Sequence, residues 1–100
     1  MLTVAERFER LAKPRQVAAW TLAPSTRSAK KWMVTITTQH AVQERPRTIV
    51  VHFGDSSMED YTQHHDKERR RRFHQRFASL IAATRNNPLS PMYYTARLLW

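Results

Sequence analysis

The sequence predicts one small α+β domain. Two segments, at about 31–38 and 47–53, have the alternation of strands and would pair as an antiparallel hairpin. A third segment, at about 66–84, has the spacing of an amphipathic helix that would pack against this hairpin. One hundred residues suffice for one such domain, not two. We expect residues 30–100 to form its core and residues 1–24 to form a helical segment that is either part of it or an extension.

The N-terminal segment opens with a helix signal. Thr3 followed by Glu6 is a capping box, which satisfies the free N–H groups of a helix's first turn. Pro14 ends or bends this helix. Residues 15–23 have no clear period, although their large apolar residues are expected to be buried, and residues 24–26 form a linker. The apolar residues in question are Val17, Trp20 and Leu22.

The two strands are rich in β-branched residues. In the first, Trp32, Val34 and Ile36 share one face, and in the second Ile49, Val51 and Phe53 do. A polar connection at 39–47 joins them. Gly54, the only glycine of the chain, follows the second strand and is expected where φ is positive or where a side chain would clash.

One apolar face predicts the helix at 66–84, and a serine–proline pair predicts the start of a second helix nearer the C-terminus. Asn86-Asn87-Pro88 ends the first helix, and Ser90-Pro91 opens a short C-terminal helix. The chain finishes on Leu98-Leu99-Trp100, which we expect to dock on the protein's own core or on a neighbour. The apolar face of the longer helix comprises Phe73, Phe77, Leu80, Ile81 and Thr84.

Composition limits the partners and the cofactors. The net charge of +9 and a pI near 11.1 imply an anionic partner, either nucleic acid, an acidic protein face or anionic lipid. The absence of cysteine excludes disulfides and thiolate metal sites. No apolar run approaches the roughly 20 residues of a membrane span, and the N-terminus has no signal-peptide core. We therefore expect a soluble protein.

The charge changes sign abruptly between residues 55–66, which are acidic, and residues 67–76, which are mainly basic. Arg69 and Arg76 flank the apolar stripe of the predicted helix, where an unpaired cation is costly. We therefore predict a structural clasp in which Asp60 and Asp66 pair with these two arginines. The groups left to meet an outside partner are Lys67, Arg71, Arg72, Tyr61, Leu99 and Trp100, with Tyr93 or Tyr94 as further exposed contacts.

The histidines suggest a metal site only weakly. His64, His65 and Asp66 are adjacent, but adjacent histidines diverge on a regular element and no HxxxH or HxH pair occurs. A helix cap or loop anchor at His64 or Asp66 is the better interpretation. A P-loop or GxGxxG motif is impossible with one glycine, and GxSxG is absent. No cofactor, metal or catalytic residue is predicted.

At HFGDSSMEDYTQHHDKERRRRFHQRF and the distal SPMYYTARLLW, the chain resembles a family of short proteins of large eukaryotic DNA viruses. The resemblance covers about residues 48–100 as a spaced motif. The chain departs from the family pattern in two places: Phe77 stands where the pattern has a histidine, and the glycine before the terminal segment is missing. The first departure weakens a catalytic role for the family histidine, because this chain lacks it. The matching positions are Phe53, Gly54, Asp60, Tyr61, Thr62, His64, Asp66, Arg69, Phe73, Arg76, Leu99 and Trp100.

The resemblance implies a virus-encoded protein without an established activity, and the expected role is that of a virion component such as a minor capsid or shell-associated protein. Its partners would be other virion proteins, and it would occur in the virion and, during assembly, in the host cytoplasm or nucleus. The leading hypothesis is a non-enzymatic structural or interaction protein. The second is a basic nucleic-acid-binding protein of the viral core, and a metal-dependent nuclease is a distant third.

Overall fold

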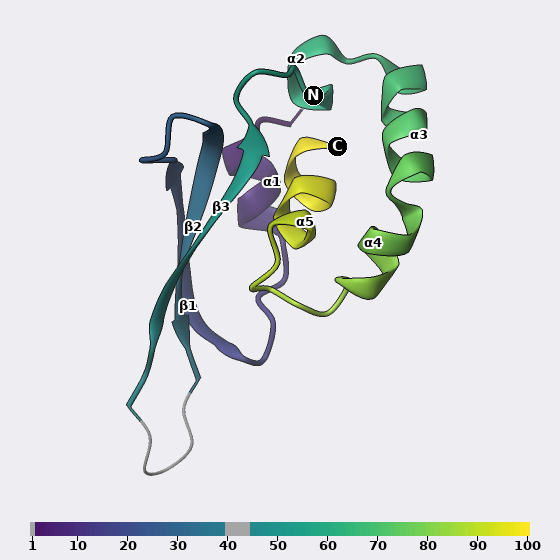
Figure 1. The fold of residues 1–100 in the computed structure, drawn as a ribbon. Coiled ribbons are helices and arrows are strands. Elements are labelled where there is room, and N and C mark those ends of the chain that lie inside the picture. The colour runs from purple at the N-terminus through teal and green to yellow at the C-terminus, as the bar shows by residue number, and fades with distance from the viewer. Residues whose placement is uncertain (1, 40–44) are drawn as a thin grey trace.

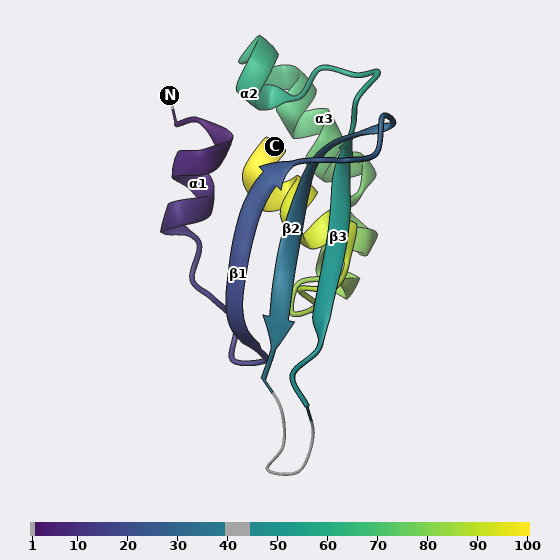
Figure 2. The same ribbon diagram turned by 90° about the vertical axis from the view of Figure 1, so that its left-hand side faces the viewer.

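The computed structural model describes residues 2–39 and 45–100. It confirms the α+β class: a three-stranded antiparallel sheet carries helices on one of its faces, and no described helix covers the other face (Figures 1 and 2). The strand order is β1-β2-β3. The elements are α1 Val4–Arg10, β1 Val17–Pro24, β2 Lys30–Thr38, β3 Thr48–Asp55, α2 Tyr61–His64, α3 Lys67–Arg76, α4 Ala78–Ala83, α5 Pro91–Tyr94 and the π-helical turn η1 Thr95–Leu99.

The predicted hairpin is confirmed as β2 and β3. The register sets Trp32 opposite Phe53, and Val34 opposite Val51. Val34, Val51 and Phe53 are buried, as alternation requires of the face that packs on the core. The second strand continues through Gly54 to Asp55 instead of stopping at the glycine. Most of the connection expected at 39–47, residues 40–44, lies outside the described residues.

Residues 17–24 form strand β1, so the prediction of a helical segment over 1–24 is wrong beyond α1. The register with β2 shifts between Val17 and Ala19, while Trp20 stands opposite Ile36 and Leu22 opposite Val34. This irregularity turns Val17 and Trp20, three positions apart, to the same side of the sheet. Because these two apolar residues are three positions apart and not two or four, the sequence does not show the alternation that identifies a strand. With β1 in place, β2 becomes the central strand.

Helix caps follow the sequence closely. The capping box of Thr3 and Glu6 is present at α1, and Asp66 is the N-cap of α3, accepting hydrogen bonds from the N–H groups of Glu68 and Arg69. The helix predicted over 66–84 is interrupted at Phe77, which separates α3 from α4. The bond from the Phe77 N–H to the Phe73 carbonyl keeps the two helices nearly continuous.

The layer that packs on the sheet is the C-terminal helix, not the helix predicted over 66–84. In Figure 1 the α5–η1 segment lies between the sheet and α3–α4, which forms the outer layer. Neither α3 nor α4 has a buried residue. The cations of α3 cannot be buried without partners, whereas the C-terminal segment is apolar enough to fill the centre of the fold. Its buried residues are Tyr93, Tyr94, Leu98 and Leu99.

Tyr94 lies at the middle of the core. Its ring packs on Phe53, with 5.5 Å between centroids, and edge-on to Trp20 at 6.1 Å. The hydroxyl donates a 2.6 Å hydrogen bond to the Pro88 carbonyl, so this buried polar group is satisfied. Burial raises the pKa of Tyr94 far above its usual range. The phenol therefore stays neutral in the folded protein.

Gly54 meets both conditions expected of it. Its φ is +81°, and a Cβ at this position would lie 2.8 Å from the Leu99 Cδ1 and 3.4 Å from the Lys31 Cβ. Gly54→Ala combines a left-handed conformation with a steric clash, so we expect it to lower the free energy of unfolding by about 2–4 kcal/mol. Urea unfolding measures this cost.

The matched background for this test is Leu99→Val, which removes the δ carbon that the new Cβ would meet. In that background the cost of Gly54→Ala should fall to the conformational part, about 1–2 kcal/mol. An alanine that is tolerated in both backgrounds would contradict the strained geometry at this position.

Candidate docking groove

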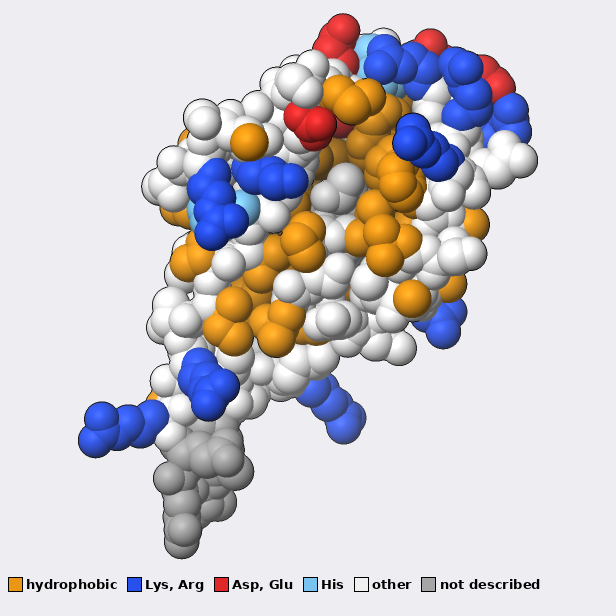
Figure 3. Space-filling model, viewed as in Figure 1, with side chains coloured by type: hydrophobic (Ala, Val, Ile, Leu, Met, Phe, Trp, Pro, Cys, Tyr) orange, Lys and Arg blue, Asp and Glu red, His pale blue; other side chains and the backbone are white. Residues whose placement is uncertain are grey.

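An open groove of about 890 Å³ runs between α3–α4 and the end of the sheet where β2 begins and β3 ends. The α5–η1 segment and the terminal Trp100 supply its floor. Figure 3 shows this face: hydrophobic side chains line the hollow, cations stand on both sides of it and acids gather near its upper end. The groove is larger than the shallow concavity of about 580 Å³ on the other side of α3.

The α3–α4 wall carries two parallel rows of side chains. Phe73, Phe77 and Leu80 are spaced i, i+4 and i+7, which places them on one helical face across the slight break at Phe77. Arg69, Arg72 and Arg76 also line the groove at a similar spacing. Each row extends about 10 Å along the helix axis, and the arginine row begins one turn before the apolar row, so the two overlap between Phe73 and Arg76 for about 5 Å.

The terminal Trp100 ties α3 to the floor. Its ring stacks on Phe73 with 4.5 Å between centroids and an interplanar angle of 3°. The Trp100 ring also lies near His64, with 5.2 Å between the two ring centroids. Leu99, beside it, is 1% exposed and belongs to the core, so its assignment as a partner contact is wrong. The chain end therefore docks on its own core, and Trp100 remains partly exposed within the groove.

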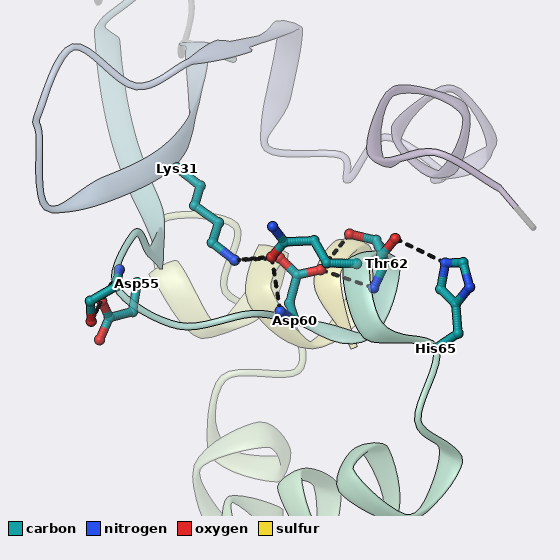
Figure 4. A network of polar contacts seen from close by, with 7 residues as sticks. Lys31, Asp55, Asp60, Thr62 and His65 are labelled. Atoms are coloured by element: carbon teal, nitrogen blue, oxygen red, sulfur yellow. Dashed lines mark hydrogen bonds and ion pairs between the residues drawn. The ribbon is translucent and has the colours of Figure 1, made fainter.

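The acidic end of the groove is organised by Asp60, which is 3% exposed. Its carboxylate accepts a 2.8 Å hydrogen bond from the Lys31 Nζ and another from the Thr62 N–H, 2.9 Å long (Figure 4). The latter makes Asp60 the N-cap of α2. Gln63 completes the network, because its side-chain oxygen accepts from both Lys31 and the Asp60 N–H. The same hydrogen bonds thus satisfy the buried Asp60 carboxylate and hold the start of α2 against β2.

The predicted clasp is therefore wrong in its partners. Among the described residues, Asp60 pairs with Lys31, and neither Arg69 nor Arg76 forms an ion pair with Asp60 or Asp66. Helical geometry did place both arginines beside the apolar stripe, as predicted. The error arose because Lys31 is 29 residues away in the sequence and its strand alternation assigned it to the opposite face.

Asp66 anchors the start of α3 through the backbone. It accepts from the N–H of Arg69 at 3.1 Å, and this bond is the main reason why the pKa of Asp66 is lowered. The interpretation of Asp66 as a helix cap is confirmed. The guanidinium of Arg76 lies 5.1 Å from the centroid of the Phe77 ring instead of meeting an acid. Arg76 therefore remains part of the groove wall.

The other predicted partner contacts divide clearly. Lys67, Arg71 and Arg72 are exposed, and Arg72 alone of these lines the groove. Arg71 is held by Glu68, with 2.5 Å between its Nη2 and the carboxylate. Tyr61 is 4% exposed and lies beneath the guanidinium of Arg70, 4.7 Å from its ring centroid, so its prediction as an exposed contact is wrong. Tyr93 and Tyr94 are buried too.

The histidines serve the corner between α2 and α3. His64 Nδ1 accepts a 2.9 Å hydrogen bond from the Asp66 N–H, and His65 takes a positive φ of 56° as the C-cap of α2. Over residues 2–39 and 45–100, no group of three or more His, Asp or Glu side chains is placed to hold a metal ion. His64 as a loop anchor agrees with these contacts.

Sequence reasoning missed Lys31 and Met92 as groove residues. Met92 follows the helix-opening Pro91, and that signal predicted the helix without predicting which surface it would line. In the same described ranges, no helix combines the length and apolar character needed to cross a bilayer.

Comparison with known proteins gives one match. Residues 20–77 match the family of unknown function DUF5754. Neither the curated proteins nor the solved structures include a match to the chain. The matched span contains most of β1, all of β2, β3, α2 and α3, while α4 and the floor of the groove lie outside it. Because the match covers more than half of its length, the chain belongs to the DUF5754 family.

Proposed function

We propose that this protein is a non-enzymatic interaction protein that holds a partner protein in the groove beside α3–α4. The observation that supports this proposal most is the apolar wall left open to solvent: Leu80 is 46% exposed and Met58 56% exposed within one concave surface. Apolar residues gathered in such a hollow are typical of protein-binding surfaces. The buried acid of the groove, Asp60, is engaged in capping α2 and in its ion pair with Lys31.

The setting that we propose is the virion of a large eukaryotic DNA virus, with the chain as a minor capsid or shell-associated protein. This part rests on the resemblance over residues 48–100. Mass spectrometry of purified particles, separated into shell and nucleoprotein core, tests it. Recovery with the shell is expected, and absence from both fractions would contradict the virion setting.

A pair of leucine variants tests the groove itself. Leu80 lies in the groove and Leu89 lies outside it, and both are 46% exposed. Leu80→Glu should remove the protein from the assembled complex because it places a carboxylate on the apolar wall, while Leu89→Glu should leave assembly intact. Native size-exclusion chromatography with quantitative blotting measures the assembled fraction.

Both substitutions lie at exposed positions, so both variants should melt like the wild type, which controls for misfolding. Equal incorporation of the two variants into the complex would contradict docking at the groove.

A second candidate function is nucleic-acid binding on the side of α3 that carries Lys67, Arg70, Arg71 and His74. These residues line a shallow concavity of about 580 Å³, and the chain has a net charge of +9. Binding through phosphates would weaken steeply with salt. A titration of duplex DNA at several salt concentrations measures this slope, and a slope near zero would contradict this candidate.

A further inference from the structure

We propose that the occupant of the groove is an amphipathic helix of the partner protein, with carboxylates along one edge of its apolar stripe. This inference rests on the proposed docking function and adds the chemistry of the partner. It is carried by three features of the groove, which are the spacing of its apolar wall, the cations beside that wall and the acids at one end.

The apolar wall has the spacing that a helix can match. Phe73, Phe77 and Leu80 follow one another at i, i+4 and i+7, and Met92 and Leu99 line the floor. A helix laid along α3–α4 would present its own apolar residues at the same intervals, which is the usual mode of recognition in an apolar groove. The open side of the groove gives such a segment access without a change of fold.

The cations beside this wall have no carboxylate partner within the described residues. Arg69, Arg72 and Arg76 line the groove, and the ion pairs among the described residues are those of Lys31 with Asp60 and Arg71 with Glu68. Lys30 stands on the opposite wall and is exposed. A partner with carboxylates at matching intervals would gain charge-assisted hydrogen bonds with the arginines.

The acids of the groove fix the orientation of this helix. Asp55, Glu59 and Asp60 lie at the end formed by β3 and the loop that follows it. Asp60 is neutralised by Lys31, and Asp55 accepts hydrogen bonds from the N–H and hydroxyl of Ser57. Asp55 and Glu59 would repel carboxylates placed near them. The acidic edge of the partner must therefore face α3.

The same features disfavour a nucleic-acid backbone in the groove. A nucleic-acid backbone would place charged phosphates against Phe77, Leu80 and Met92. Phosphates do not remove this apolar surface from water, so the contact would gain little from it. The cations that face away from the groove, Lys67, Arg70 and Arg71, would be left out of the contact.

The test is a selection from a displayed library of amphipathic helices against the full chain. The library keeps one leucine stripe and varies three positions beside it among Glu, Lys and Gln. We expect Glu to be enriched about tenfold over Lys at these positions, since each pair with an arginine contributes a fraction of a kcal/mol to about 1 kcal/mol. The same selection is run against the Arg69→Glu/Arg72→Glu/Arg76→Glu variant, and there Lys should replace Glu.

Enrichment of Glu that reverses with the arginines supports the inference. Enrichment of Lys or Gln by the unchanged protein, a preference for Glu that persists in the variant, or failure to enrich any helix overturns it. The inference would also be overturned if a duplex DNA probe bound the groove arginines and displaced the selected helices. None of these outcomes changes the result of the Leu80→Glu assembly test. The proposed docking function and the inference of a helical partner can therefore fail separately.

Discussion

Deletion of Leu98–Trp100 is expected to unfold the protein. Leu98 is fully buried and Leu99 is 1% exposed, and both pack in the core between the sheet and α3–α4. Truncating one buried leucine to alanine costs about 3–5 kcal/mol. Losing two, together with the stacking of Trp100 on Phe73, approaches the whole stability of a small domain, about 5–15 kcal/mol. Circular dichroism and a nitrogen-edited NMR spectrum would report the loss.

Single substitutions make this effect quantitative. Leu98→Ala should lower the free energy of unfolding by about 3–4 kcal/mol, and Leu89→Ala, at a position 46% exposed, should change it by less than about 0.5 kcal/mol. The chemistry of the two changes is identical, so their difference measures burial alone. A truncated chain that still melts cooperatively at the wild-type temperature would contradict the central position of the C-terminal helix.

Asp60→Ala is expected to lower the free energy of unfolding by about 3 kcal/mol. The substitution leaves the Lys31 ammonium without its carboxylate in a position where the lysine side chain is 15% exposed. It also removes the N-cap of α2. Breaking a buried ion pair from one side typically costs about 3–5 kcal/mol, and losing a cap about 1 kcal/mol. Chemical denaturation followed by tryptophan fluorescence measures the change.

The chain provides its own control for this prediction. Glu68 and Arg71 form another ion pair, and both of their side chains are more than half exposed. Glu68→Gln should leave the melting temperature unchanged because exposed pairs contribute little. The double variant Lys31→Met/Asp60→Asn should lose less stability than the sum of its single changes. Equal effects of Asp60→Ala and Glu68→Gln would refute the account of Asp60.

Local signals in the sequence predicted local structure well. The capping box of Thr3, the cap at Asp66, the strand alternation around Val34 and Val51 and the special position of Gly54 are all confirmed. Each depends on residues close together in the chain, where spacing fixes which groups meet. The same holds for the row formed by Phe73, Phe77 and Leu80, which shares one face of α3–α4 and lines the groove.

Contacts between distant segments could not be predicted in the same way. Strand β1 was missed because the shift of register near Val17 exists only in its pairing with β2. The partner of Asp60 was taken to be a nearby arginine, although Lys31 comes from a strand across the fold. The position of the C-terminal helix between the sheet and α3–α4 depends on which of two apolar faces fills the core more completely. Spacing along the chain carries no information on that competition.

The central claim is that the groove beside α3–α4 meets a protein, and photocrosslinking tests it most directly. A photoreactive phenylalanine analogue is placed at position 80 in the groove or at position 89 outside it, in the cells or particles where the complex forms. The account predicts that crosslinks from position 80 converge on one segment of one protein and that position 89 gives none. Crosslinks from both positions to the same mixture, or from position 80 to nucleic acid, would contradict it.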